Sequence, residues 1–405
     1  MRKVKLSNCG DFILTPKLST NELSPNNYIT TDNMLPNKAG IEKISNIPSN
    51  LNVTQFVKND ILLSNIRPYF KKIWLAKFSG GCSADVLIFR TNNNYDSSYI
   101  KYCLSQDSFF IYNMAGAKGS KMPRGDKQHI LNFELLDFDL MTQKKIGNLL
   151  KAIDEKIDLN NKINSELEKI AKELYNYWFV QFDFPDEKER PYKSSGGKMV
   201  YNQELKREIP YEWEVKTLND CVTTIIDKRG VTPKKLGGDW VRNGIIALSA
   251  KIVKNNRLIH LDEANQVSKE MFEKWMKEKL QDGDILMTSE APLGEFYYLV
   301  GNTNYCLSQR LFAIRANPAI VTHSYLFNEL SEGHGFSQII GKQSGSTVFG
   351  IRQDELRKVL VIVPNIEIQK RFTQIVLPNY RLLRKLETEN LELVSLRDYL
   401  LPLLM

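Results

Sequence analysis

Residues 153–167 read Ile153-Asp-Glu-Lys-Ile157-Asp-Leu-Asn160-Asn-Lys-Ile-Asn164-Ser-Glu-Leu167, and this stretch decides the fold of the 405-residue chain. Alternating steps of four and three residues trace a mostly apolar stripe through it, which extends from Ile146 to Trp178. A sustained period of 3.5 residues is typical of a coiled-coil seam, whereas a helix on a globular surface repeats every 3.6 residues. Roughly forty residues at ~1.5 Å per residue predict a rod of ~60 Å.

A second stripe of the same period ends the chain, and its first nine positions match those of the first at a constant offset of 226 residues. Neither helix can bury so narrow a stripe alone, so we expect the two helices to pair antiparallel. The alternative is that each stripe packs on its own globular domain. The predicted seam comprises Ile146, Leu150, Ile153, Ile157, Asn160, Asn164, Leu167, Leu174, Phe372, Val376, Leu383, Leu386, Asn390, Leu393 and Leu400.

Polar and helix-breaking residues interrupt both stripes. Asparagine costs stability on an apolar seam, so we interpret Asn160, Asn164 and Asn390 as residues that fix the register. Pro378 lacks a backbone donor and is expected to kink the second helix or shift its start.

The segments before the two helices repeat as well. Asp60-Ile-Leu-Leu-Ser recurs as Asp284-Ile-Leu-Met-Thr, 224 residues later (284 − 60), and both Gly119-Ser and Gln143-Lys-Lys recur 226 residues later, the latter as Gln369-Lys-Arg. Three matches in the same order at nearly one offset predict two tandem copies of one plan. Short apolar runs and interspersed helical patterns make each copy α+β. The predicted architecture is therefore two tandem α+β domains separated by an antiparallel two-helix coiled coil, with a pseudo-two-fold internal repeat.

The boundaries follow from the same patterns. We expect domains at 1–140 and 209–364, each followed by a coiled-coil helix at 141–182 and 365–405. Residues 183–208 include Pro-Asp-Glu-Lys-Glu-Arg-Pro and Ser-Ser-Gly-Gly, a composition typical of a linker.

Composition narrows the class of partner. The net charge of +8 favours a polyanion, and no apolar run is long enough to span a membrane. Five cysteines without a C-x-x-C pair indicate reduced thiols and a cytoplasmic protein, and the four histidines lack metal-ligand spacing. We therefore expect no membrane association and no metal site.

Two catalytic patterns are imperfect. Pro185-Asp186 with Glu204-Leu-Lys206 has the residue order of many metal-dependent nucleases, yet it lies in the polar linker. The segment from Gly335 to Lys342 resembles a phosphate-binding loop, but it has one residue too many between its glycines and no following Ser or Thr. The sequence therefore predicts no catalytic residue, no cofactor site and no metal site.

Basic residues cluster beside aromatic residues, and glycine- and serine-containing loops recur at matched places in both copies. Lys and Arg neutralise phosphates, and small residues let a loop approach a duplex closely. We expect DNA contacts from Arg67, Lys71, Lys72, Lys118, Ser120, Lys121, Arg124, Lys127, Lys228, Arg229, Lys234, Lys235, Arg242, Lys251, Arg257, Lys342, Gln343, Ser344, Ser346 and Arg352.

Three segments carry a resemblance to a known family. They are Ile209-Pro-Tyr-Glu-Trp213-Glu-Val-Lys-Thr-Leu218, the helical stretch from Ile153 that ends in Trp178-Phe-Val-Gln-Phe182, and Leu396-Arg-Asp-Tyr-Leu-Leu-Pro402-Leu. The first resembles the opening of a target-recognition domain in the specificity subunits of type I restriction-modification systems. The other two are similar to that family's central conserved helix and to the end of its C-terminal conserved helix. The resemblance covers essentially the whole chain.

The resemblance implies a non-catalytic subunit that recognises double-stranded DNA. Each target-recognition domain would read one half of a bipartite, asymmetric target, while the coiled coil sets the gap and docks two methyltransferase (M) subunits. Restriction (R) subunits would join them, and S-adenosylmethionine, ATP and magnesium would be needed only by these partners. Two alternatives remain: a stand-alone DNA-binding or architectural protein without methyltransferase partners, and a metal nuclease that uses the linker carboxylates.

Overall fold

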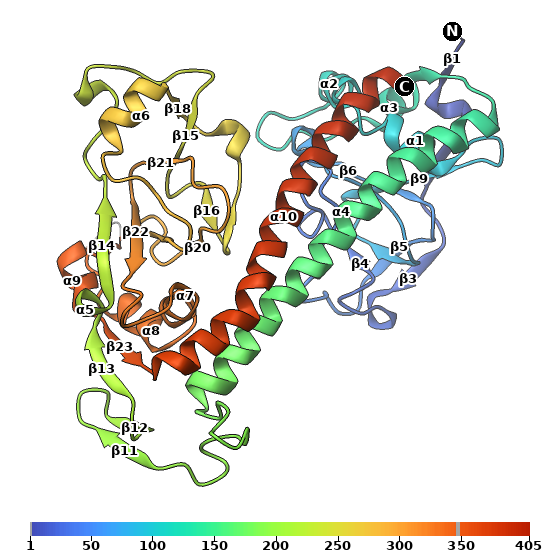
Figure 1. Cartoon of the computed structure of the whole chain (residues 1–405). Coiled ribbons are helices and arrows are strands. Elements are labelled where there is room, and N and C mark those ends of the chain that lie inside the picture. Colours follow the sequence, from blue (N-terminus) through green and yellow to red (C-terminus); the bar gives the residue numbers. More distant parts are fainter. Residues whose placement is uncertain (1, 346–348) are drawn as a thin grey trace. The chain divides into compact units, whose positions relative to one another are not determined.

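The computed structural model describes residues 2–345 and 349–405 and divides into two compact units (Figure 1). Unit 1 comprises Met1–Asn160 together with Glu389–Met405, and unit 2 comprises Asn161–Thr388. Each unit thus contains one globular domain and a part of both long helices.

Unit 1 is built on two four-stranded sheets and one strand pair. The first sheet has the order β2 (Gly10–Ile13), β9 (Val86–Thr91), β6 (Ile61–Ser64), β7 (Ile73–Leu75) and is antiparallel throughout. The second has the order β3 (Lys17–Ser19), β5 (Asn52–Phe56), β8 (Gly80–Cys82), β4 (Tyr28–Ile29), and β1 (Lys3–Lys5) pairs with β10 (Glu134–Leu136). The helices are α1 (Ser97–Cys103), α2 (Asp107–Ala115) and α3 (Lys127–Leu131), with 3₁₀ turns η1 (Leu6–Asn8), η2 (Thr20–Glu22) and η3 (Pro68–Phe70).

Unit 2 repeats this plan. Its four-stranded sheet has the order β14 (Val222–Asp227), β22 (Leu311–Ala316), β19 (Ile285–Thr288), β20 (Phe296–Tyr298), and β13 (Glu214–Thr217) pairs with β23 (Leu360–Val363). The other strands are β18 (Gln266–Val267), β15 (Ile245–Leu248) and β21 (Cys306–Leu307) in one sheet, and the pairs β16 (Val253–Lys254) with β17 (Arg257–Leu258) and β11 (Met199–Asn202) with β12 (Arg207–Pro210). The helices are α5 (Leu218–Cys221), α6 (Lys269–Trp275), α7 (His323–Ser331), α8 (His334–Gly341) and α9 (Gln353–Arg357), with 3₁₀ turns η5 (Lys234–Leu236) and η6 (Leu261–Glu263).

The inner strands β6, in the first sheet of unit 1, and β19, in the four-stranded sheet of unit 2, are buried on both faces. In β6, Ile61 and Leu63 pack in one hydrophobic cluster with α1, while Leu62 packs in another with Trp74. In β19, the odd and even residues likewise divide between two clusters. Successive strand residues point to opposite faces, so a strand covered on both sides becomes a continuous apolar run. This explains why the two recurring apolar motifs mark equivalent strands.

Polar contacts recur with the strands. Arg90 forms two hydrogen bonds of 2.7 Å with the buried carboxylate of Asp60, and Arg315 binds Asp284 at 2.8 and 2.9 Å.

The glutamines at the start of the long helices repeat as well. Gln143 accepts a hydrogen bond from the backbone N–H of Asp96 at the start of α1, and Gln369 accepts one from Thr322 at the start of α7. The predicted α+β class and internal repeat are confirmed at the level of individual contacts.

The two long helices are α4 (Leu140–Tyr175), extended by a π-helical turn at Asn176–Val180, and α10 (Ile366–Leu404). They pair antiparallel within each unit: Asp154 contacts Arg397 and Asn160 contacts Asn390 in unit 1, while Tyr175 packs against Phe372 in unit 2. Pro378 does not shift the start of the second helix, because α10 begins at Ile366 and continues through this residue. That part of the expectation was wrong.

Every residue of the predicted seam is buried or half-buried. The seam faces more than the opposite helix, however. Leu150 packs with Leu401 of α10 and also with Tyr102 of α1, and Phe372 packs both with Trp178 and with the core of the unit 2 domain. The two packing modes considered for the stripes therefore occur together.

The interspersed helices are short. The stretch from Ser98 to Tyr112 contains two of them, because the chain leaves α1 at Leu104 and α2 begins after Gln106. The expected linker differs from the structure. Residues 183–208 contain β11 and part of β12, and Phe184 and Leu205 pack in the core beside Trp213.

Candidate nucleic-acid interface

Two basic segments of unit 1 lie side by side. The N–H of Arg67 donates to the carbonyl of Pro123 at 2.8 Å, and Ile66 forms a bridge with Arg124. These bonds place Lys71 and Lys72 on one loop and Lys118, Ser120, Lys121 and Lys127 on or next to the other. The structure therefore joins the eight unit 1 candidates into one surface, which we call the unit 1 loop surface (residues 65–72 and 116–127).

Carboxylates of unit 1 itself neutralise part of the charge of this surface. Lys71 pairs with Asp107 at 2.9 Å, Lys118 with Asp126 at 2.9 Å, and Arg124 with Asp85 at 3.0 Å. The hydrogen bond from Lys118 lowers the pKa of Asp126 to about 2. Lys72 instead donates to the carbonyl of Thr31, while Ser120 and Lys121 are exposed and Lys127 is half-buried. Exposed ion pairs contribute little stability, so a phosphate competes for these cations at small cost.

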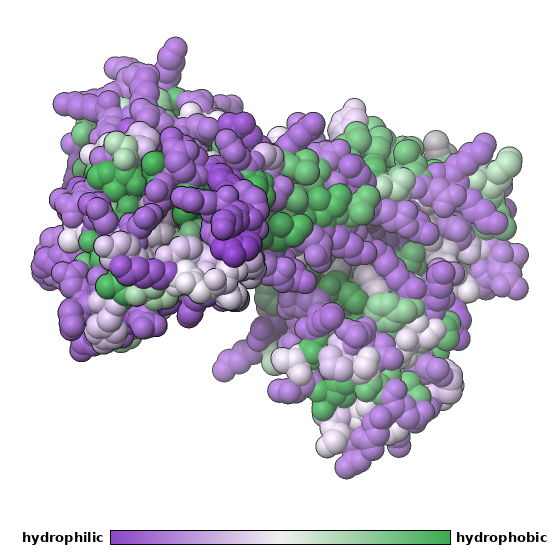
Figure 2. All heavy atoms as spheres, turned by 60° about the horizontal axis from the view of Figure 1, so that its bottom comes forward, coloured by the Kyte–Doolittle hydropathy of each residue, from purple (hydrophilic) through white to green (hydrophobic). Residues whose placement is uncertain are grey.

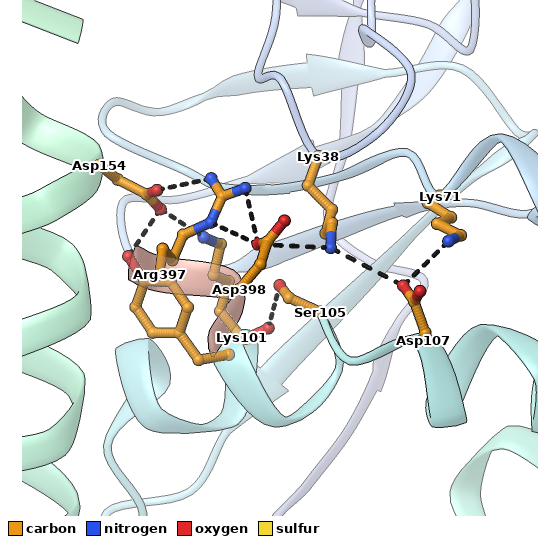
Figure 3. A network of polar contacts seen from close by, with 9 residues as sticks. Lys38, Lys71, Lys101, Ser105, Asp107, Asp154, Arg397 and Asp398 are labelled. Carbon is orange, nitrogen blue, oxygen red and sulfur yellow. Dashed lines mark hydrogen bonds and ion pairs between the residues drawn. The ribbon is translucent and has the colours of Figure 1, made fainter. Parts of the chain in front are cut away.

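A polar network in unit 1 links this surface to the helix pair (Figure 3). Asp154 of α4 accepts hydrogen bonds from Lys101 at 2.8 Å, Tyr102 at 2.7 Å and Arg397 of α10 at 3.0 Å. Burial opposes ionisation of Asp154, but Lys101 and Arg397 hold its pKa at about 2.

The same network continues to the loops. Arg397 pairs with Asp398 at 3.0 Å, and the ammonium group of Lys38 lies 3.9 Å from Asp398 and 3.8 Å from Asp107, which also binds Lys71 (Figure 3). Burial lowers the pKa of Lys38. Loops and helices of unit 1 are thus fixed to each other by charge.

The unit 2 candidates are more dispersed. Arg229 pairs with Asp227 at 2.7 Å, Lys235 caps the carbonyl of Gly230, and Arg352 begins α9. Lys228, Lys234, Arg242, Lys251, Lys342, Gln343 and Ser344 lie on turns and loops, and Ser346 lies outside the described residues. Gln353 donates to the carbonyl of Ile225, so the ends of the two candidate segments meet beside β14.

Arg257, another predicted DNA contact, lies beside both long helices of unit 2. It lies 3.7 Å from Glu168 of α4 and 4.0 Å from Glu387 of α10. Buried Arg384 of α10 reaches the other way, donating to the backbone carbonyls of Asn256 at 2.8 Å and Tyr298 at 3.0 Å. The hairpin β16–β17 is therefore tied to both long helices within unit 2.

Comparison with known proteins agrees with this architecture. The sequence model of the type I restriction modification DNA specificity domain matches residues 210–394. The specificity subunit of the type I restriction enzyme MjaIX from Methanocaldococcus jannaschii is 25% identical over 312 residues, which cover 76% of this chain and 67% of the relative. The chain is thus similar to the specificity subunits of type I restriction-modification systems.

Two further matches extend the comparison. The HindI specificity subunit from Haemophilus influenzae is 27% identical over 167 residues, 38% of this chain and 36% of the relative. The crystal structure of the S subunit of a type I restriction-modification system from M. genitalium shares the fold, with a TM-score of 0.62 at 14% identity over 100% of this chain and 96% of that one.

In the nuclease-like pattern, the carboxylate of Asp186 is engaged in local hydrogen bonds. Asp186 accepts hydrogen bonds from the backbone N–H groups of Lys188 and Arg190 and pairs with the Arg190 guanidinium at 2.9 Å. Glu204 and Lys206 lie in the turn between β11 and β12. Across residues 2–345 and 349–405, no three His, Cys, Asp or Glu side chains are grouped so that they could hold a metal ion, and no helix is long and apolar enough to cross a membrane.

The long helices also carry apolar side chains that nothing covers. Figure 2 shows a mainly hydrophilic face on which hydrophobic residues gather in separate patches. Large apolar residues at least 40% exposed lie on α4 and α10: Met141, Leu149, Leu159, Ile170, Ile375, Leu382, Leu391, Leu396, Tyr399 and Leu403. Exposed apolar side chains are available for contact with a partner where they lie next to one another on a helix.

Sequence patterns missed several residues beside the interface. Asn65, Asn113 and Lys38 were not candidates, because a single Asn or Lys carries no periodic or motif signal. Asn37 and Lys38 both have positive φ and form a tight turn. Asparagine is enriched at positive φ, so residue preferences would predict this conformation at Asn37 but not at Lys38. The missed residues are partly or fully buried, and burial is a property of the fold.

Proposed function

We propose that this chain is a type I restriction-modification specificity subunit that recognises a bipartite, asymmetric site in double-stranded DNA, with residues 1–140 contacting one half-site and residues 209–364 the other. The observation that carries the proposal is the repeated plan. Each unit holds the same sheet, the same glutamine contact and a glycine-containing loop at a matched position between α2 and α3 or between α8 and α9. Lys and Arg around these loops supply phosphate affinity, and polar side chains supply base discrimination.

The helix pair formed by α4 and α10 is the spacer in this proposal. Two modest half-site readers gain affinity from each other only when their separation matches that of the half-sites. A flexible linker tolerates any separation, whereas a packed antiparallel helix pair does not. The buried seam and the Asp154 and Arg384 networks support a stiff spacer.

The exposed apolar residues of α4 and α10 support docking of two methyltransferase (M) subunits, with restriction (R) subunits added to the complex. This proposal assigns S-adenosylmethionine, ATP and magnesium to those partners. It predicts co-purification with a methyltransferase subunit, lost when Tyr399 and Leu403 are both changed to Asp. A stand-alone DNA-binding protein would retain its DNA affinity without such a partner and would tolerate both changes.

An insertion tests the spacer. Four residues added after Asn160 in α4 and four after Thr388 in α10 lengthen the pair at the boundary between the units, leaving the contacts within each unit unchanged. At ~1.5 Å per residue the helices grow by ~6 Å, close to two base pairs of ~3.4 Å. We expect the preferred gap, measured by methylome sequencing of cells expressing the variant, to lengthen by about two base pairs.

The matched control is a four-residue insertion in the turn Lys193–Gly197, which lies outside both helices. It should leave the gap unchanged. An unaltered gap after the double helix insertion, in a complex that still methylates DNA, would show that the helices do not set the spacing.

A further inference from the structure

The base of the unit 1 loop surface contains polar side chains without partners. Asn113 of α2 is 0% exposed, and neither its Oδ1 nor its Nδ2 has a hydrogen-bond partner among the described residues. The same holds for Oδ1 of Asn65, at the end of β6, and for Nε of Arg67. Buried amide and guanidinium groups are normally hydrogen-bonded, so these four unpartnered atoms of the unit 1 loop surface and its base need an explanation.

Glycine at position 125 brings these groups together. A Cβ atom there would lie 2.6 Å from Oδ1 of Asn113 and 3.0 Å from Oδ1 of Asn65. The N–H of Gly125 donates to the backbone carbonyl of Asn65, which fixes the loop above α2. Both amide oxygens therefore face the same point beneath the loop, without a donor.

Unit 2 provides an internal control for the fold. The hydrogen bond from Gly125 to Asn65 recurs as one from Ile351 to Ser289, and the bridge of Ile66 with Arg124 recurs as Glu290 with Gly350.

At the matched positions, Ala291 replaces Arg67 and buried Ile339 replaces Asn113. Both Arg67 and Ala291 have positive φ, 50° and 53°. Ser289 takes the place of Asn65, and its buried Oγ also lacks a partner among the described residues. The two units therefore differ at the places of Arg67 and Asn113, where unit 2 has apolar residues.

Arg67 is the cation of this surface best suited to a base contact. Lys71, Lys118 and Arg124 each pair with a carboxylate, whereas Arg67 forms no ion pair within the described part of the chain. It is half-buried, so one end of its side chain is fixed, and it precedes the exposed aromatic residues Tyr69 and Phe70. Arginine binds O6 and N7 of guanine through two hydrogen bonds, the commonest specific contact in the major groove.

We propose that Arg67 reads a guanine in the half-site bound by unit 1, and that Asn65 and Asn113 position its side chain from beneath the loop. This inference rests on the function proposed above and makes it specific to one unit and one base. Unit 2, with Ala291 and Ile339 at the matched places, discriminates its half-site through other residues.

The test uses the full chain assembled with its methyltransferase subunits and a duplex library with both half-sites randomised. In Arg67→Ala, which introduces the unit 2 residue, preference for guanine at one position of one half-site should fall about tenfold or more, with the other half-site unchanged. A duplex with 7-deazaguanine at that position lacks N7. The wild-type complex should bind this duplex about tenfold more weakly than the guanine duplex. The Arg67→Ala complex should bind the two duplexes with equal affinity.

Asn113→Ile separates positioning from stability. Because Ile fills the matched place in unit 2, the melting temperature should stay level or rise, while the same guanine preference weakens. Lys121→Ala is the matched control: this exposed cation of the same loop should weaken binding to all sequences alike and reduce its salt dependence.

Two results would overturn the inference. Arg67→Ala could keep every base preference, or Asn113→Ile could lower the melting temperature and leave the preferences intact, which would make the cluster structural. A wild-type complex without any base preference would contradict the proposed function itself. If base preference is lost only when residues of other unit 1 loops are changed, the proposed function stands and only the assignment to Arg67 is wrong.

Discussion

The two units share a plan but differ in the residues of their matched loops. Contacts that close the fold recur in both, as the Asp60–Arg90 and Asp284–Arg315 pairs show. The loops differ: unit 1 presents Lys118, Lys121 and Arg124, where unit 2 presents Ser344 and neighbouring small residues. A duplicated domain thus reveals which polar groups the fold needs, because those are present twice, and which are available for recognition.

The largest expected effect concerns the repeated ion pair. Asp284→Ala leaves Arg315 without its buried partner and should destabilise unit 2 by about 3 to 5 kcal/mol. Asp60→Ala should cost less in unit 1, about 2 kcal/mol, because the Arg90 side chain is 37% exposed and Arg315 only 17%. Hydrogen exchange of β6 and β19 measures each unit separately. Equal losses below 1 kcal/mol would mean that the repeated pairs do not hold the fold.

The next effect belongs to unit 2 alone. Glu329 of α7 is buried and accepts a hydrogen bond from Tyr175 at 2.5 Å, whereas the matched residue of unit 1 is Cys103. Burial raises the pKa of Glu329 from 4.5 to about 7, although the Tyr175 hydrogen bond opposes this. The folded protein therefore keeps a proton that the unfolded chain has already released above pH 4.5.

It follows that stability present below pH 4.5 is lost as the pH rises to about 7, by on the order of 3 kcal/mol. Glu329→Gln keeps an acceptor for Tyr175 and carries no charge. We expect it to remove this decline in unit 2 and to stabilise the unit at pH 8, as measured by urea unfolding at several pH values. Cys103→Ser, the control in unit 1, should leave the pH profile unchanged, and a persistent decline in Glu329→Gln would assign it to another group.

The smallest effect compares two asparagines of the α4 seam. Asn160, in unit 1, donates to Asn390 at 2.9 Å and to Glu389 at 2.8 Å, whereas both side-chain atoms of Asn164, in unit 2, lack partners among the described residues. Asn164→Leu should therefore raise stability by about 1 kcal/mol, and Asn160→Leu should lower it by about the same amount. Thermal unfolding of both variants distinguishes them, and a loss in Asn164→Leu would point to a polar contact at that site.

The sequence alone predicted the duplication because the recurring residues hold the same local position in each copy. Asp60 and Asp284 follow one pattern, a carboxylate that opens a strand buried on both faces, and Gln143 and Gln369 open matching helices. The 3.5-residue stripe predicted the antiparallel helix pair for the same reason, since periodicity is visible without knowledge of the partner.

The rest depends on contacts distant in sequence. Nothing near Arg384 indicates that it binds carbonyls 86 and 128 residues away, at Tyr298 and Asn256. The polar segment 183–208 was predicted to be a linker because its few apolar residues, such as Phe184, follow no periodic pattern. These residues nevertheless pack in the hydrophobic core of unit 2. Likewise Asn113 looks like any polar helix residue until the loop above it is in place.

Unit 1 is discontinuous along the chain, since Glu389–Met405 completes it, and Leu401 packs against Leu150 and Tyr102. During synthesis, unit 1 therefore cannot complete its core until α10 has been made. Until residues 389–405 leave the ribosome, the apolar side of α4 at Leu150 has no partner from α10. A nascent chain cut short before residue 389 would thus lack a complete unit 1, even though residues 1–160 had been translated.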